Sequence, residues 1–243
     1  MDGARPYEAF SRDYDALQGE LAEACWDSGI IRELGRYRRT SGRVFDAGAG
    51  TGVGARKLKS LGTFEVTSCD QSWSMLSTAE PFSDKVLHAN LADLPMLEKR
   101  FDLVLSGFDA LNYLKPDALA SFFGWCKTHL TQGGLLVFDY SSPTLLREEW
   151  RSREYVDHRD SLALRRTHRY DANYGRAVID LACFDRGQER WRETHYQYSV
   201  SCEEMVRLAH ESAMGLLSVR DLGDDGYSAD AHTHVYAIAI GAS

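Results

Sequence analysis

The stretch Val44-Phe45-Asp46-Ala47-Gly48-Ala49-Gly50-Thr51-Gly52 decides the fold of this chain. Its apolar start predicts a strand over 43–46, and its glycines predict a tight turn into a helix over 51–61. Strands and helices then alternate, with strands predicted over 64–69, 85–88, 101–105 and 135–139 and helices over 72–79 and 116–130. This alternation predicts an α/β fold, a mainly parallel sheet with helices on both faces.

The pattern differs at the start of the chain and after residue 143. Apolar residues recur at helical spacing in the first forty residues, which predicts an N-terminal helical cap over 1–40. Long segments rich in β-branched and aromatic residues predict an antiparallel meander, with strands over 162–170, 176–185 and 189–200. A helix is predicted from Ser201, and two last strands, over 216–219 and 234–240, are predicted to return to the main sheet.

These patterns predict a core made of 1–143 and 201–243 and an antiparallel insertion over 144–200 that forms a substrate lid. A chain of 243 residues is long enough for one such domain with a sizeable core. The exposed strands of the lid could also pair between subunits, so a homo-oligomer is a further expectation.

Composition restricts the partners of the protein. The net charge of −8 argues against a nucleic-acid substrate. No apolar run is long enough to span a bilayer, and the N-terminus has no secretory signal, so we expect a cytoplasmic protein with no membrane partner. None of the five cysteines forms a CxxC pair, and we find no convincing metal-ligand set, so no metal is expected.

Glycine-rich turns of this kind hold one of two cofactor classes. Dinucleotides use GxGxxG, but Val53 stands where the third glycine of that pattern is expected. The loop fits S-adenosylmethionine better, and Asp46 can meet the amino acid tail of that molecule directly or through water. Asp70, twenty residues after Gly50, can accept hydrogen bonds from ribose hydroxyls in either cofactor. A dinucleotide-dependent oxidoreductase and a non-catalytic cofactor-binding protein remain alternatives at this point.

Four segments resemble the class I S-adenosylmethionine-dependent methyltransferases: 44–52, 69–76, 88–95 and 131–139. The resemblance implies a Rossmann-like seven-stranded sheet whose last strand is antiparallel, with S-adenosylmethionine as cofactor and S-adenosylhomocysteine as product. It also implies a set of cofactor-binding residues: Tyr14, Asp46, Gly48, Ala49, Gly50, Asp70, Gln71, Met75, Asn90, Leu91 and Ser106. The family often has Asp where this chain has Asn90, whose amide oxygen can still accept a hydrogen bond from an amine.

The flanking segments are similar to those of small-molecule methyltransferases. Residues 7–15 resemble their Y-x-x-F-A-x-x-Y-D opening, and 108–114 resemble the segment after their fourth strand. The meander resembles the β lid of amino-sugar N-methyltransferases of antibiotic biosynthesis. This likeness implies a small polar acceptor, with N-methylation of an amine in natural-product biosynthesis expected first and O-methylation of a hydroxyl as the alternative.

Methyl transfer from a sulfonium is an in-line displacement, so the enzyme has to align the reactants and, where needed, remove a proton. The resemblance places Tyr14 near the sulfonium and Tyr113 in the active site, and His195 is a candidate base. Asp139 and Tyr140 end the fifth strand, where they can anchor the substrate. Trp191, Glu193, His195 and Gln197 share one face of a lid strand, and we expect Trp191 and Glu193 to contact the substrate.

Overall fold

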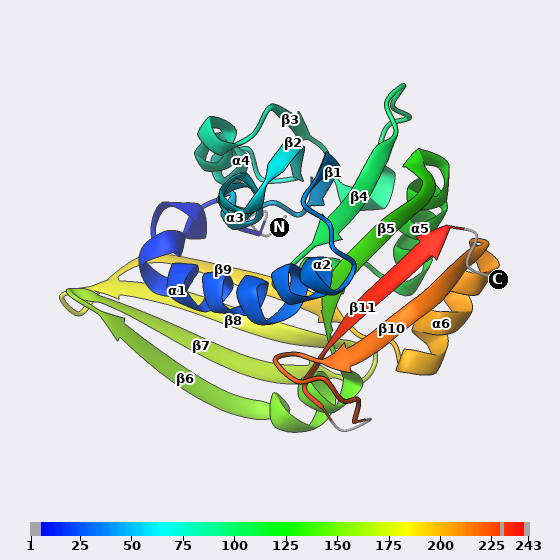
Figure 1. The fold of residues 1–243 in the computed structure, drawn as a ribbon. Helices are drawn as coiled ribbons and strands as arrows, with labels where there is room; N and C mark the ends of the chain where they lie inside the picture. The colour runs from blue at the N-terminus through cyan, green and yellow to red at the C-terminus, as the bar shows by residue number, and fades with distance from the viewer. Residues whose placement is uncertain (1–5, 229–230, 241–243) are drawn as a thin grey trace.

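The computed structural model describes residues 6–228 and 231–240, and a seven-stranded sheet forms its centre (Figure 1). The strand order is β10-β11-β5-β4-β1-β2-β3. The strands are β1 (Ser41–Ala47), β2 (Thr63–Asp70), β3 (Lys85–His88), β4 (Phe101–Ser106), β5 (Leu130–Ser141), β10 (Met214–Asp221) and β11 (Thr233–Ile240). β11 runs antiparallel to β5 and β10, and the other neighbouring strands are parallel. The predicted fold class, including its antiparallel last strand, is confirmed.

Helices cover both faces of this sheet. They are α1 (Tyr14–Trp26), α2 (Arg32–Arg36), α3 (Val53–Leu61), α4 (Trp73–Ala79), α5 (Pro116–His129) and α6 (Cys202–Glu211). Alternate side chains of β5 point to opposite faces, as in any strand. Leu135 and Val137 pack in the cluster that contains residues of α1, α2 and α3, whereas Leu136 and Phe138 pack with α5 and α6. The central strands are therefore buried on both sides.

The insertion forms a separate antiparallel sheet of four strands, which we call the lid sheet (Figure 1). Its strands are β6 (Ser152–Arg159), β7 (Leu162–Asp171), β8 (Arg176–Asp185) and β9 (Gln188–Tyr198). We predicted the last three but missed β6. It is an edge strand, largely exposed and rich in charged residues, so it lacks the apolar alternation by which strands are predicted.

A buried amide fixes the lid sheet at the carboxyl end of the main sheet. Asn112, which follows β4, donates from Nδ2 to the carbonyls of Ser141 at 3.0 Å and Tyr198 at 2.8 Å. Its Oδ1 accepts from the backbone N–H of Ser141 at 2.9 Å. Because Ser141 ends β5 and Tyr198 ends β9, both sheets meet where ligands of open α/β sheets bind.

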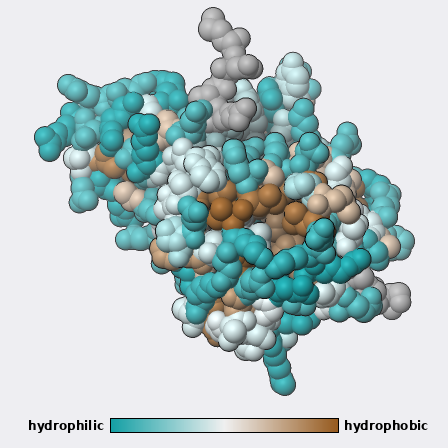
Figure 2. Space-filling model, turned by 90° about the horizontal axis from the view of Figure 1, so that it is seen from above, coloured by the Kyte–Doolittle hydropathy of each residue, from teal (hydrophilic) through white to brown (hydrophobic). Residues whose placement is uncertain are grey.

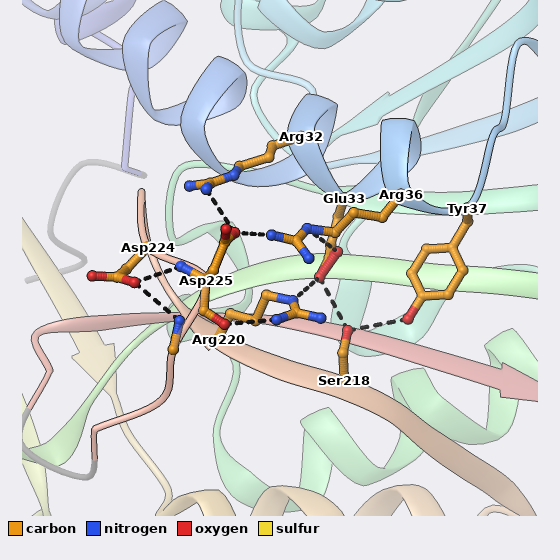
Figure 3. Close-up of polar contacts among 9 residues, drawn as sticks. Arg32, Glu33, Arg36, Tyr37, Ser218, Arg220, Asp224 and Asp225 are labelled. Atoms are coloured by element: carbon orange, nitrogen blue, oxygen red, sulfur yellow. Dashed lines mark hydrogen bonds and ion pairs between the residues drawn. The ribbon is translucent and has the colours of Figure 1, made fainter.

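A second polar cluster holds the N-terminal helices against the C-terminal strands (Figure 3). Glu33 of α2 is 2% exposed and accepts from Ser218 Oγ at 3.0 Å and Arg220 Nε at 3.1 Å, both on β10. Arg32 and Arg36 pair with Asp225 in the loop after β10. These contacts keep α2 in place on its face of the sheet.

The surface is mostly hydrophilic, with a central area of hydrophobic residues on the face seen in Figure 2. Within residues 6–228 and 231–240, no helix is long and apolar enough to cross a membrane.

Candidate active site

The turn after β1 can be made only with glycines at its key positions. The backbone N–H groups of Gly48 and Ala49 both donate to the carbonyl of Cys69, at 2.8 and 2.9 Å. Gly48, Gly50 and Gly52 have φ angles of 75°, 55° and 86°, in the left-handed region that favours glycine. A Cβ on Gly48 would lie 2.6 Å from the Cβ of Ala110. The loop is therefore pressed against the segment that follows β4.

A first cavity of about 280 Å³ opens at this loop. Its lining includes most of the predicted cofactor residues: Tyr14, Gly48, Ala49, Gly50, Asp70, Gln71, Met75, Asn90 and Leu91. Asp46 and Ser106 are the two that do not line it. The Ser106 hydroxyl donates to the carbonyl of Ala47 at 2.8 Å, so it joins β4 to β1 and does not face a ligand.

Asp70 is arranged to receive a diol. Its Oδ2 accepts from the N–H of Gly50 at 2.9 Å, and its Oδ1 accepts from the N–H of Ser72 at 2.8 Å. Each oxygen keeps accepting capacity beyond this one hydrogen bond. Burial raises the pKa of Asp70, although backbone hydrogen bonds oppose that change. Two adjacent ribose hydroxyls would satisfy the remaining lone pairs.

Asp46 lies behind the cavity wall with an unsatisfied charge. It is 0% exposed, and neither carboxylate oxygen has a hydrogen-bond partner among the described residues. Burial, together with the negative charge of Asp70, raises the pKa of Asp46 to about 7. A cationic group bound in the first cavity would lower the cost of this charge. The residues present therefore fit the ribose and the amino acid tail of S-adenosylmethionine.

A second cavity, of about 230 Å³, lies between the N-terminal segment and the lid sheet. Four aromatic residues line both cavities: Tyr7, Tyr14, Phe108 and Tyr113. Among the described residues, no protein group hydrogen-bonds to the hydroxyl of Tyr14. A molecule in the second cavity would meet a cofactor in the first cavity at this shared wall.

A chain of hydrogen bonds runs from the shared wall into the lid sheet. The hydroxyls of Tyr7 and Tyr113 lie 2.8 Å apart, and that of Tyr113 lies 2.8 Å from His195 Nδ1. His195 Nε2 lies 2.8 Å from Glu193 Oε2. The structure thus brings the predicted Tyr113 and His195 together, and it adds Tyr7, which we did not predict. Such a chain can move a proton away from the wall.

Glu193 fastens the N-terminal segment to the lid sheet. Its carboxylate accepts from the N–H groups of Tyr7 at 2.9 Å, Ala9 at 2.6 Å and Phe10 at 3.0 Å, besides the contact with His195. Burial alone would raise the pKa of Glu193, but these donors hold it below its usual value. Glu193 lines neither cavity, so we replace its predicted substrate role with a positioning role.

Trp191, on the same strand β9, also holds the N-terminal segment. Its indole N–H donates to Asp13 Oδ2 at 2.8 Å, and its ring packs against Phe10 with centroids 5.1 Å apart. It lines neither cavity, so its predicted contact with substrate is replaced by packing against the N-terminal segment.

The substitution Glu193→Gln is expected to loosen the N-terminal segment. The amide NH₂ would face N–H donors, leaving buried groups unpaired, and the free energy of unfolding should fall by about 2 kcal/mol. Backbone hydrogen exchange at residues 7–10 would accelerate. Because the pKa of Glu193 is lowered in the folded state, its stabilisation is present above the unfolded pKa and is lost as the pH falls through the folded value.

The matched control is Glu189→Gln on the same strand, whose exposed side chain pairs with Arg192. It should change the free energy of unfolding by less than about 0.5 kcal/mol. Equal effects of the two substitutions in thermal unfolding would contradict the role given to Glu193.

Asp139 also positions other residues. Its carboxylate accepts from the backbone N–H groups of Phe108 at 2.7 Å and Asp109 at 2.5 Å. These two residues have φ angles of 58° and 54°, which are strained for residues other than glycine. Asp139 lines neither cavity, so its predicted role as a substrate anchor becomes one of holding this turn. Tyr140, predicted with it, is buried and its hydroxyl donates to the carbonyl of Tyr198 at 3.2 Å.

The turn held by Asp139 places the carboxylate of Asp109 at the second cavity. Burial and the negative charge of Asp139 raise the pKa of Asp109 to about 7, although a hydrogen bond from Gln197 opposes this. Within the described part of the chain, no Lys, Arg or His forms an ion pair with it. We did not predict a role for Asp109 in binding the acceptor, because the residues around it, Asp139 and Gln197, come from segments far apart in the sequence.

Comparison with known proteins agrees with this geometry. The methyltransferase domain family matches residues 44–134. The candidate methyltransferase YqeM of Bacillus subtilis is 26% identical over 208 residues, which are 82% of each chain. A solved S-adenosylmethionine-dependent methyltransferase from Clostridium acetobutylicum shares the fold with a TM-score of 0.82 at 20% identity, over 98% of this chain and 100% of the other.

The solved sugar N-methyltransferase KedS8 of Streptoalloteichus has a TM-score of 0.70 at 20% identity, over 99% of this chain and 94% of its own. Such identities establish a shared fold. Together with the matched domain and the lining of the first cavity, they lead to one conclusion: the chain is an S-adenosylmethionine-dependent methyltransferase.

Proposed function

We propose that the enzyme transfers a methyl group to a basic amine of a small polar metabolite in natural-product biosynthesis. The observation that carries this proposal is the carboxylate of Asp109, which lines the second cavity close to the wall shared with the cofactor cavity and has no cationic partner. An ammonium group is the ligand that such a half-buried carboxylate without a cationic partner fits. The fold shared with a sugar N-methyltransferase of known structure is consistent with this reading.

In this proposal, the lid sheet closes over the acceptor and each polar group has a defined task. S-adenosylmethionine supplies an electrophilic methyl group when bound. Asp109 binds the acceptor ammonium and takes one proton from its nitrogen, which frees the lone pair for attack. The net reaction replaces one N–H bond by N–CH₃ and releases one proton, which Asp109 passes to water. Tyr14 and Tyr113, on the shared wall, orient the nitrogen toward the methyl group.

O-methylation of a small hydroxylated metabolite is the second candidate, and a specific observation favours it. The chain Tyr113–His195–Glu193 resembles the arrangement by which a carboxylate orients a histidine base. His195 would then take the hydroxyl proton through Tyr113. The two candidates use different residues of the same cavity, so substitutions can separate them.

The test is a panel of small amines and matched alcohols, assayed by formation of S-adenosylhomocysteine. We expect turnover with amines and at least about tenfold less with the alcohols of the same carbon skeleton. The second candidate would replace the first if only alcohols are methylated, if His195→Asn abolishes this activity and if Asp109→Asn leaves it unchanged.

We also propose that the enzyme acts in the cytoplasm on a free small molecule. Its net charge of −8 offers no general attraction to nucleic acid or to anionic lipid. Formation of a homo-oligomer through exposed lid strands remains a prediction.

A further inference from the structure

We propose that the acceptor is a dipolar amine, with its basic nitrogen at Asp109 and an anionic group, such as a carboxylate, bound by Arg166 across the second cavity. This inference rests on the proposed amine methylation and adds the class of acceptor. It concerns the part of the acceptor that does not react.

The charged groups around the second cavity are few and opposite in sign. Apart from two histidines and the tyrosines, Asp109 and Arg166 are the acidic and the basic residue of its described lining. Burial and the nearby Arg166 lower the pKa of His168 to about 4, so this histidine is neutral at pH 7. The second cavity thus offers a bound acceptor one carboxyl group and one guanidinium group.

Arg166 lies two strands away from the lid strand that faces Asp109. Gln197, whose side chain opposes the rise in the pKa of Asp109, belongs to β9, whereas Arg166 belongs to β7, with β8 between them. Neighbouring strands lie almost 5 Å apart, so the two strands are separated by about 10 Å. In an α-amino acid the amine and the carboxylate are attached to one carbon, so they are too close together to reach Asp109 and Arg166 at the same time. The anionic group of the acceptor therefore lies several bonds from its nitrogen.

The guanidinium of Arg166 still has capacity for a ligand. One Nη pairs with Asp157 on the neighbouring β6, and the group lies over the ring of Tyr155, 5.8 Å from its centroid. Its Nε–H is buried and has no hydrogen-bond partner among the described residues. The Asp157 side chain is 40% exposed, so water weakens its hold on the charge. A carboxylate could bind the planar donor edge that remains.

Arg166 also lies where the second cavity reaches the surface. A third cavity, of about 150 Å³, shares Gln18, Leu21 and Arg166 with it and opens between α1 and the strands β6 and β7. An acceptor that enters here amine-first would leave its anionic end beside Arg166. This direction of entry agrees with a nitrogen that must reach the shared wall.

The test uses ω-amino carboxylates of increasing length, from glycine to 8-aminooctanoate, each compared with the n-alkylamine of equal chain length. S-adenosylhomocysteine formation gives kcat/KM for each. We expect a long member of the series to exceed both glycine and its own alkylamine at least tenfold. In Arg166→Gln this ratio of carboxylate to alkylamine should fall at least tenfold, mainly through KM.

The control is Arg169→Gln on the same strand, where Arg169 is exposed and points away from the cavity. It should keep the ratio of the unaltered enzyme. Calorimetric titration of Arg166→Gln with S-adenosylhomocysteine verifies that the cofactor cavity is intact. Equal kcat/KM for carboxylates and alkylamines, or an unchanged ratio in Arg166→Gln, overturns this inference alone. Failure of every amine, charged or not, overturns the proposed function instead.

Discussion

The substitution Gly48→Ala is expected to weaken binding of S-adenosylmethionine at least 100-fold, roughly 3 kcal/mol. Two effects add. Alanine at a φ of 75° is strained, and its Cβ would lie 2.6 Å from the Cβ of Ala110. Ala110 also lines the first cavity, so relief of the clash must move one wall of the cofactor site. Calorimetric titration with S-adenosylmethionine and with S-adenosylhomocysteine measures the loss.

Two further variants separate local strain from a general loss of stability. Gly124, inside α5, has open space around its Cα, so Gly124→Ala should bind the cofactor normally and gain about 0.5–1 kcal/mol of stability. Adding Ala110→Gly to Gly48→Ala removes the Cβ–Cβ clash and should restore part of the affinity. If Gly48→Ala binds normally, or if the second change restores nothing, the contact between loop and wall does not govern binding.

The cofactor half of the site could be predicted from the sequence because its geometry is local. Left-handed φ angles at Gly48 and Gly50 belong to the turn itself, and each such position favours glycine whatever surrounds it. Asp70 ends the strand next to β1, so its place at the turn follows from the pairing of two consecutive parallel strands. Short-range patterns thus predicted most of the lining of the first cavity.

The acceptor half could not be predicted in the same way, because long-range contacts determine it. Glu193 contacts the N–H of Tyr7 across 186 positions of the chain, and no spacing rule relates them. A buried carboxylate at the end of a strand can either bind a ligand or hold backbone N–H groups, and the sequence does not distinguish the two roles. Asp139 was predicted to bind the substrate, but it holds the turn that presents Asp109. Period-two alternation placed Glu193, His195 and Gln197 on one face correctly, but it could not show which of them reach the cavity.

The substitution Asp109→Asn is expected to lower kcat about 100-fold toward the preferred amine, because the acceptor nitrogen loses its proton acceptor. Binding of S-adenosylhomocysteine should not change, since Asp109 does not line the first cavity. Asp117→Asn, at the exposed start of α5, is the matched control and should keep full activity.

The pH profile identifies which group acts as the base. Burial raises the pKa of Asp109 to about 7, so the rate of the unaltered enzyme should fall about tenfold per unit below pH 7. Asp109→Asn should lose this acid limb. If the limb persists there and disappears in His195→Asn instead, then His195 is the base and the role assigned to Asp109 is wrong.

The substitution Asp109→Asn, which lowers activity, should raise the stability of the protein at alkaline pH. Between its ordinary unfolded value near 4 and its folded value of about 7, Asp109 binds more protons in the folded than in the unfolded protein. Its contribution to the free energy of unfolding therefore declines as the pH rises through this window.

At pH 8 the cofactor-free Asp109→Asn variant should unfold at a higher temperature than the unaltered enzyme. Its free energy of unfolding should be larger by at least about 1 kcal/mol. At pH 4 the two should be nearly equal, because Asp109 is then protonated in the folded state and carries no charge to bury. A carboxylate kept for catalysis at the expense of stability predicts both results together, whereas a structural carboxylate predicts that Asp109→Asn is less stable at both pH values.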